Sequence, residues 1–279
     1  MLPPSRPRRI AAKELLLPLV LGALALLFVT PFLLMVVSAF KTQAEVLRTP
    51  PTFLPVAPTL DGFRTLLRDA PYGMWYRNSM VVATAVTAAV LLTSSLAGYV
   101  FAKFEFPAKR PLFLLVLSTM MIPFPVLLIP TYLIVDKLEL LNSLWALIVP
   151  GMVSAFGIFL MRQFIAGIPN DLIEAARIDG ASEWSIYGRV IVPLVRPALA
   201  ALGVFSFLAS WNDYLWPLVA INDLEKSTVP LALAFFNTAN SQRYDLIMAA
   251  ATLAVAPVLV VFLIFQRQIV KALVLAGMK

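Results

Sequence analysis

Long stretches without charge divide the sequence into candidate membrane spans. Five stretches of 21 residues or more contain no Lys, Arg, Asp or Glu: 15–40, 78–102, 111–135, 140–161 and 246–266. A helix that crosses a bilayer needs about 20 apolar residues, so each stretch is long enough. A sixth stretch, 197–221, contains a single charged residue, Asp213. The pattern predicts an all-α membrane protein with six transmembrane helices.

The distribution of basic residues predicts how these helices are oriented. Six spans place both chain ends on the same side, and Lys and Arg gather on the cytoplasmic side of membrane proteins. With both termini in the cytoplasm, inner segments hold 14 and outer segments 8 of the 22 basic residues. We therefore expect cytoplasmic termini, although the five basic residues of the outer loop 41–77 oppose the rule.

The first span has a second interpretation as a secretory signal. Basic residues from Arg6 to Lys13 precede it, and Val37 to Ala39 resembles a cleavage site. Its apolar stretch is far longer than the roughly 7 to 15 residues of a signal sequence. We expect a retained membrane helix, and we divide the chain into residues 1–77, with the first helix and outer loop, and a five-helix core at 78–279. A short amphipathic helix near residues 60–68 is predicted in that loop, either as a packing element or as a docking surface.

The amino-acid composition excludes several classes of function. Apolar residues make up 61% of the 279 residues and charged residues 13%, about half the usual share in soluble domains. The net charge is +7, but the basic residues do not form a patch with interleaved aromatic residues, which argues against nucleic-acid binding. The sequence contains no Cys and no His, so disulfides, thiol catalysis and imidazole chemistry are excluded. We predict no catalytic residue, metal or cofactor on this chain.

The loop at about 162–196 carries the densest group of acids. Four of them lie within thirteen residues: Asp171, Glu174, Asp179 and Glu183. Asp171 and Glu174 have the spacing of an acidic capping box, which predicts a helix beginning at Asp171. We expect Gly180 to end that helix and Ser182 to cap a second one. Two capped helices in one loop favour a docking element, and the alternative is a solvated connector.

The same loop carries a family resemblance. Its motif contains Glu174, Ala175, Ala176, Gly180 and Pro193, preceded by Arg162-Gln163-Phe164. This pattern resembles the signature loop of binding-protein-dependent ABC transporter permeases, most closely the maltose-type carbohydrate branch, and the similarity covers about residues 75–275. Departures from the family pattern are Val190, Val192 and Ala272.

The resemblance implies an ABC importer permease fold and a set of partners. In the family this loop is a coupling helix that docks on a cytoplasmic ATP-binding subunit. The residues that the resemblance assigns to coupling are Glu174, Ala175, Ala176, Arg177, Asp179, Gly180 and Pro193. It further implies a second homologous permease, most simply a different chain, two ATP-binding subunits that use ATP and Mg, and an extracytoplasmic solute-binding protein. The location would be the lipid of a prokaryotic cytoplasmic membrane, and the cargo a carbohydrate or polyol.

ATP hydrolysis is not expected on this chain itself. A phosphate-binding loop reads Gly, four residues, then Gly-Lys-Ser or Gly-Lys-Thr, and none of the eleven glycines begins one. We therefore interpret the chain as a transport subunit that is not an enzyme.

The substrate path is less clearly marked. Asp213 is the one acid placed inside a predicted span, and such residues are candidates for function. The candidates for the path are Tyr132, Trp211, Asn212, Asp213 and Tyr214. The aromatic neighbours of Asp213 also fit an interfacial belt, which would be structural. Prolines in the third and fourth spans, from Pro123 to Pro150, predict breaks for gating or ordinary kinks.

Other functions remain open from the sequence. An ABC importer for a solute other than a carbohydrate has the same motifs. An ion-coupled secondary transporter would place paired ionisable groups near the middle of its spans, where this sequence has none. A membrane scaffold without transport activity is the third alternative.

Overall fold

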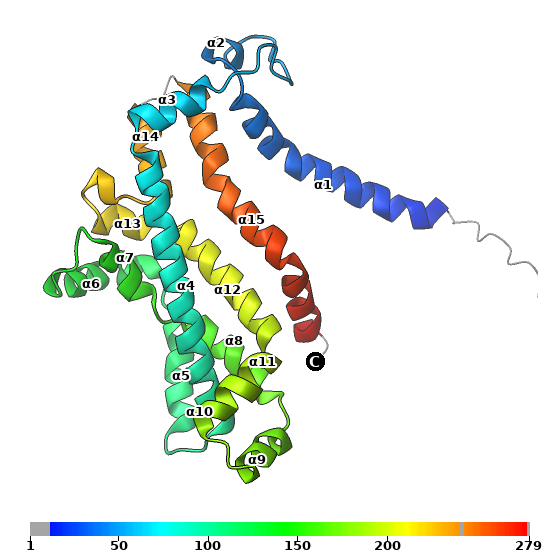
Figure 1. The fold of residues 1–279 in the computed structure, drawn as a ribbon, viewed down its shortest axis with the longest axis vertical. Coiled ribbons are helices and arrows are strands. Elements are labelled where there is room, and N and C mark those ends of the chain that lie inside the picture. The colour runs from blue at the N-terminus through cyan, green and yellow to red at the C-terminus, as the bar shows by residue number, and fades with distance from the viewer. Residues whose placement is uncertain (1–11, 240–242, 278–279) are drawn as a thin grey trace, which may run out of the picture. The chain divides into compact units, whose positions relative to one another are not determined.

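The computed structural model describes residues 12–239 and 243–277. Within these residues the regular structure is helical throughout (Figure 1). The chain forms two compact units, one from the described parts of Met1–Asp69 and Asn240–Thr252, the other from those of Ala70–Ala239 and Leu253–Lys279. The all-helical prediction is confirmed for the part of the chain that the structure covers.

The first unit contains one long apolar helix and a folded loop. Its helices are α1 (Ala12–Ser38), α2 (Gln43–Val46), α3 (Asp61–Asp69) and the start of α15 (Tyr244–Gly277). The apolar part of α1, Leu17–Ser38, is long enough to span a membrane, and none of the residues in its most apolar window is buried within the structure. The predicted amphipathic helix is present as α3, where Leu66 is fully buried and Leu67 is exposed.

Glu45 organises the loop between α1 and α3. Its Oε1 atom accepts hydrogen bonds from the Val56 backbone N–H (2.7 Å) and the Thr52 hydroxyl (3.0 Å). The Thr42 hydroxyl caps α2 by accepting from the Glu45 backbone N–H. The Val56 and Thr52 hydrogen bonds lower the pKa of Glu45 below its ordinary value of 4.5, although partial burial opposes them. One carboxylate therefore holds the loop closed in its ionised form.

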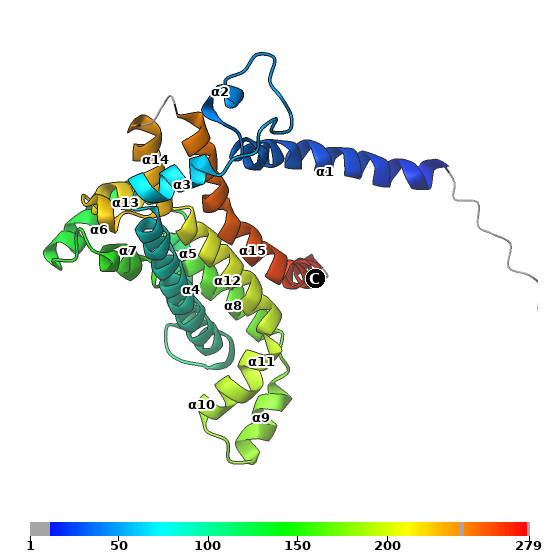
Figure 2. The same ribbon diagram turned by 45° about the horizontal axis from the view of Figure 1, so that its top comes forward.

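The second unit holds the remaining helices. Its α-helices are α4 (Tyr72–Lys103), α5 (Lys109–Thr119), α6 (Phe124–Lys137), α7 (Leu144–Gly151), α8 (Ala155–Ala166), α9 (Asn170–Ile178), α10 (Glu183–Ile186), α11 (Val192–Leu194), α12 (Arg196–Trp211), α13 (Leu215–Ala220) and α14 (Val229–Ala239), with the rest of α15. A π-helical segment η1 (Tyr187–Ile191) joins α10 to α11, and a 3₁₀ segment η2 (Leu224–Lys226) precedes α14. Figures 1 and 2 place α9 and α10 beside the end of α4 that carries Lys103.

The candidate spans are less regular than the sequence indicates. Among the described residues, α1, α4 and α15 are each long and apolar enough to cross a membrane. Three further candidates are bent pairs: α5 with α6 (101°), α7 with α8 (40°), and Glu183–Leu194 with α12 (80°). Length and composition thus allow three spans, or six if each bent pair counts as one.

Three stretches that were predicted as unbroken helices are each divided into two helices in the structure. The stretch 111–135 breaks between α5 and α6, where Pro123 precedes α6 and disfavours helical geometry at Ile122. The stretch 140–161 breaks before Ser154, whose hydroxyl caps α8 by accepting from the Gly157 N–H at 3.1 Å. The stretch 197–221 ends its first helix at Trp211, and the chain turns at Asp213 before α13.

Small residues let α4 and α8 cross closely. A Cβ atom on Gly98 would lie 2.7 Å from the Met161 Cβ and 2.9 Å from the Arg162 backbone nitrogen. One turn earlier, Ser94 on α4 faces Gly157 on α8, where an added Cβ would lie 2.3 Å from the Ser94 hydroxyl oxygen. Side chains of this size allow backbones to approach in membrane helices, where close packing replaces the hydrophobic effect. The crossing fixes α8 against the longest helix that lies wholly within the second unit.

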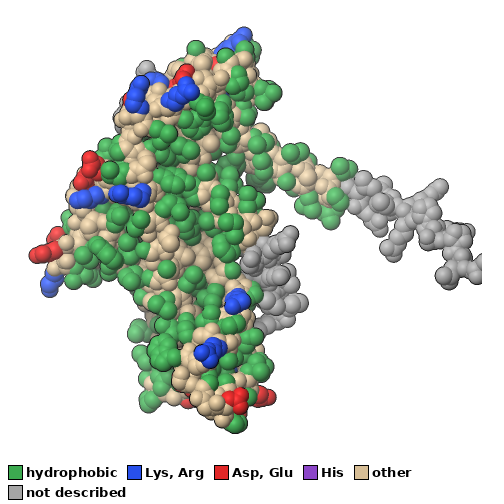
Figure 3. All heavy atoms as spheres, viewed as in Figure 1, with side chains coloured by type: hydrophobic (Ala, Val, Ile, Leu, Met, Phe, Trp, Pro, Cys, Tyr) green, Lys and Arg blue, Asp and Glu red, His purple; other side chains and the backbone are tan. Residues whose placement is uncertain are grey.

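Hydrophobic side chains are exposed along much of the molecule. In the view of Figure 3 they cover large areas of the surface between clusters of charged side chains. Exposed examples on the second unit are Val81, Leu92, Leu115, Ile129 and Phe205. Such extensive apolar surface is rare on soluble monomers and is expected where lipid or other chains cover the protein.

Replacing Gly98 with alanine should destabilise the second unit. The added methyl group meets the α8 backbone, which cannot move aside as a flexible side chain does, so we expect a loss of about 1–3 kcal/mol. Gly73→Ala is the matched control on α4, because nothing lies within 4 Å of its added Cβ. Thermal unfolding of the purified proteins in detergent measures the difference. Equal melting temperatures for G98A and the wild type would contradict the close crossing.

The loop held by Glu45 should give a pH-dependent contribution to stability. Because folding lowers the pKa of this carboxyl, its contribution is fully present above pH 4.5 and is lost as the pH falls through the lowered value. Glu45→Gln retains the hydrogen-bond acceptor and removes the charge. We expect the variant to melt at a lower temperature than the wild type at pH 7. The difference should shrink below pH 4.5, and a difference independent of pH would exclude the ionised contact.

Candidate functional site

The loop that carries the Glu-Ala-Ala motif folds into two helices, as predicted. Helix α9 begins at Asn170, and its N-cap residue Pro169 makes no side-chain capping bond, so the predicted capping box and start at Asp171 were wrong. Gly180 follows α9 with φ = +79°, a conformation that strongly favours glycine. Ser182 caps α10 as predicted, accepting from the Ser185 N–H at 3.3 Å.

Helix α9 exposes most of its motif. Ile173 is 3% exposed and anchors the helix to the core, and Ala176 packs half-buried beside it. Glu174 and Ala175 lie on the exposed side, and Glu174 forms no hydrogen bond or ion pair within the described part of the chain. Asp179 and Arg177 are also exposed, and Pro193 lies half-buried in α11.

Large apolar side chains surround the exposed motif. Ile178 is 87% exposed, Trp184 73% and Leu172 47%. Water-facing side chains of this size are costly unless another surface covers them. The arrangement of one exposed carboxylate, one small alanine and three apolar side chains fits a surface that another protein covers.

The long helix α4 holds this loop at several points. The Lys103 ammonium donates to the Ile168 carbonyl and, at 2.7 Å, to the Asn170 side chain at the start of α9. The Tyr99 hydroxyl donates to Glu183 Oε2 at 2.8 Å, and Arg177 Nε donates to Glu183 Oε1 at 2.7 Å. These contacts connect both ends of α9 to one transmembrane helix.

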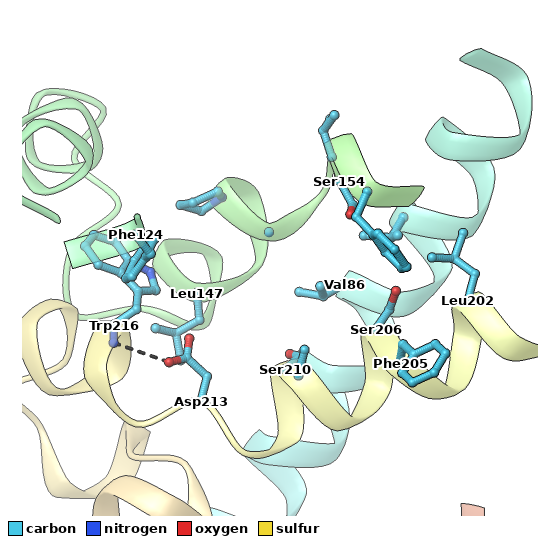
Figure 4. Close-up of a pocket in the computed structure, with 16 residues that line it drawn as sticks. Val86, Phe124, Leu147, Ser154, Leu202, Phe205, Ser206, Ser210, Asp213 and Trp216 are labelled. Atoms are coloured by element: carbon cyan, nitrogen blue, oxygen red, sulfur yellow. Dashed lines mark hydrogen bonds between the residues drawn. The ribbon is translucent and has the colours of Figure 1, made fainter. Parts of the chain in front are cut away.

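A separate cavity of about 430 Å³ lies among α4, α7 and α12 in the second unit. Its polar side chains are Ser154, Ser206, Ser210 and Asp213, and its aromatic side chains are Phe124, Phe156, Phe205 and Trp216. Figure 4 shows Asp213 beside Trp216, whose backbone N–H donates to Asp213 Oδ1 at 3.4 Å. Hydroxyl groups and a carboxylate bind polyols by hydrogen bonds, and aromatic faces pack against sugar rings.

The predicted path residues are only partly assembled at this cavity. Asp213 lines it, whereas Trp211 is buried elsewhere, with its indole N–H donating to the Ala254 carbonyl at 3.1 Å. Asn212 donates to the Leu208 carbonyl at 2.9 Å, so its side chain serves the end of α12. Tyr132 packs half-buried against the core, and Tyr214 is 41% exposed.

Three serines of the cavity were missed from the sequence. Ser206 and Ser210 are four residues apart on an apolar helix, which places them on the same face. That spacing was a usable signal for a polar stripe. Ser154 lies in the break between α7 and α8, so only the folded structure brings it to the same cavity. Within the described residues, no group of three or more acidic residues is placed to hold a metal ion.

Comparison with known proteins agrees with the loop and the fold. Residues 90–274 match the family described as binding-protein-dependent transport system inner membrane component. AraQ of Halalkalibacterium halodurans, an arabinooligosaccharide transport permease, is 35% identical over 92% of this chain and 93% of its own length. The lactose permease LacG of Rhizobium radiobacter is 34% identical over 91% and 92%. UgpE of Salmonella typhi, an sn-glycerol-3-phosphate transport permease, is 34% identical over 92% and 93%.

A solved structure shows the same fold. A chain of a bacterial ABC transporter involved in the import of the acidic polysaccharide alginate has a TM-score of 0.82. The two chains are 24% identical, and the match covers 95% of this chain and 99% of the other. With these matches, the chain belongs to the family of inner membrane components of binding-protein-dependent transport systems. It is therefore a membrane transport subunit with the ABC importer permease fold.

Proposed function

We propose that this chain is a permease subunit of an ATP-driven importer for a carbohydrate or a related polyol. The exposed Glu-Ala-Ala helix α9, in a member of this permease family, is the observation that carries the proposal. Relatives named for arabinooligosaccharides, lactose and sn-glycerol-3-phosphate support the substrate class. A non-carbohydrate solute is the alternative, and identifying the ligand retained by the cognate binding protein decides between them.

The proposed assembly contains several partners. A second homologous permease, two ATP-binding subunits and an extracytoplasmic binding protein complete the transporter, with ATP and Mg bound by the ATP-binding subunits. A solved alginate transporter, 15% identical with a TM-score of 0.67, is in complex with a periplasmic protein, which supports the last partner. In the proposed topology, α1, α4 and α15 are three spans, and α5 with α6, α7 with α8, and residues 197–221 are three more, with both termini in the cytoplasm.

In the proposed mechanism, α9 and its exposed apolar neighbours seat on an ATP-binding subunit. Closure of the ATP-binding subunits moves α9, and rigid helices carry the movement to the cavity lined by Ser206 and Asp213. The cavity opens alternately to the two sides of the membrane, so this chain needs no covalent chemistry. Glu174 supplies a directional charge at the docking surface, and Ala175 permits close approach.

Glu174→Lys and Gly180→Pro should abolish substrate-stimulated ATP hydrolysis by the reconstituted complex. The first reverses the charge on the docking surface, and the second forces φ = +79° toward about −65°, which breaks the turn after α9. Both variants should still insert into the membrane.

The matched controls are Glu139→Lys, with the same charge change between α6 and α7, and Gly188→Ala, which meets open space. We expect normal stimulation in both controls. Normal stimulation in E174K and G180P would refute the coupling assignment.

Ser206→Trp should block transport through the cavity. An indole ring in a space of about 430 Å³ removes much of the room for a sugar, so we expect loss of most substrate uptake. Uptake of labelled substrate into proteoliposomes is the measurement. Ser118→Trp on α5, which is exposed and lies outside the cavity lining, is the control. Unchanged uptake in S206W would exclude this cavity from the path.

A further inference from the structure

Helix α9 needs a firm attachment if it transmits movement. It has nine residues, and isolated helices of this length are marginal in water. One of its side chains, Ile173, is buried, while most of the others face outward. A force applied to its exposed face must therefore pass through a small number of contacts to reach the membrane helices.

A chain of side-chain hydrogen bonds provides such a path. Arg177 on α9 donates to one carboxylate oxygen of Glu183, and Tyr99 on α4 donates to the other. The carboxylate thus joins two helices whose residues are far apart in the sequence. Hydrogen bonds to a charged acceptor are stronger than neutral ones, and the Tyr99 side chain is 4% exposed.

A second hydroxyl contact supports the same helix pair. Ser95, one turn before Tyr99 on α4, shares a 2.6 Å hydrogen bond with the Tyr187 hydroxyl of η1. The Tyr99 and Tyr187 rings lie 5.9 Å apart between centroids. This contact holds η1, whereas the bond between Arg177 and Glu183 continues to the last turn of α9, opposite the end that Lys103 holds through Asn170.

The other end of the path is the cavity wall. Val86 and Val90 line the cavity from α4, the helix that carries Tyr99. Tyr99 lies nine positions after Val90, which corresponds to about 14 Å along a helix. An unbroken helix between them moves as a rigid body, so displacement at Tyr99 reaches the cavity.

We propose that Tyr99 and Glu183 are positioning residues that, with Arg177, tether α9 to α4 and couple movement of the ATP-binding subunit to the cavity. The tether deepens the proposed function and rests on it. Its role is transmission, which differs from the docking role of Glu174. Loss of the tether should leave docking and hydrolysis in place and reduce the transport obtained from each ATP.

Tyr99→Phe in the complete transporter tests the tether, because it removes one oxygen atom and keeps the ring. In proteoliposomes, we expect retained assembly, retained basal ATP hydrolysis and about fivefold less substrate moved per ATP hydrolysed. Tyr99→Phe with Tyr187→Phe removes both hydroxyl contacts and should lower the ratio further. Glu183→Gln keeps an acceptor for Tyr99 and weakens the bond to Arg177, so we expect an intermediate ratio.

Tyr76→Phe is the control on the same helix. Its half-buried ring packs near Trp211, and its hydroxyl makes no hydrogen bond within the described residues. We expect the wild-type ratio for Y76F. An equal loss in Y76F and Y99F would overturn the proposal, since loss of any hydroxyl on α4 would then have the same effect.

Three other results also overturn the tether. If Y99F moves as much substrate per ATP hydrolysed as the wild type, the hydrogen bond between Tyr99 and Glu183 is not needed for coupling. The same conclusion follows if ATP hydrolysis and substrate uptake fall in parallel, because the substrate moved per ATP is then unchanged. If the ATP-binding subunit fails to co-purify with Y99F, the Tyr99 hydroxyl maintains the structure of the docking element and does not transmit movement. Failure of the proposed function is distinguishable, because the wild-type complex would then show no ATP-driven uptake.

Discussion

Close approach of the α4 and α8 backbones determines where the loop with the Glu-Ala-Ala motif lies. Gly98 and Gly157 have no side chains to separate the two helices, and Ser94 occupies the small space that remains. Because α8 ends at Ala166 and α9 begins at Asn170, the position of α8 places α9 within a few residues of the crossing. Lys103, at the end of α4, then bonds to Ile168 between them and to Asn170 at the start of α9. Small residues within the membrane helices thus set the position of a charged motif in the loop.

The sequence predicted the parts of this arrangement that depend on local chemistry. Runs without charge indicated where helices lie, because a charge inside a bilayer is costly. Gly180 and Ser182 were correctly placed at the turn and cap, since a positive φ and an N-cap hydroxyl depend on few neighbours. The capping box at Asp171 was wrong, since α9 begins one residue earlier and its N-cap residue is Pro169, whose side chain cannot cap.

What the sequence left out depends on contacts between distant residues. Prolines marked possible breaks in the third and fourth spans, but whether a proline kinks a helix or ends it depends on the packing around it. The bond between Tyr99 and Glu183 joins residues 84 positions apart, and no periodic pattern indicates it. Likewise, Ser154 and Ser206 share a cavity because α8 and α12 both pack against α4. Asp213 was interpreted as either structural or functional; its carboxylate accepts from the Trp216 N–H in the first turn of α13 and also lines the cavity, so both interpretations stay predictions.

Exposed apolar side chains form two chemically different surfaces on this chain. In water, Ile178 and Trp184 would lose most of the free energy that burial of such side chains provides, about 1.5–3 kcal/mol each. Both flank the motif on α9, where the neighbouring charged residues argue against lipid as the cover. The apolar side chains of α1 are exposed as well, but that helix carries no charge from Leu15 to Ser38, so lipid or another membrane helix fits it. The two surfaces therefore fit chemically different covers, because the surface on α9 combines apolar area with exposed charged side chains, whereas the surface of α1 is apolar alone.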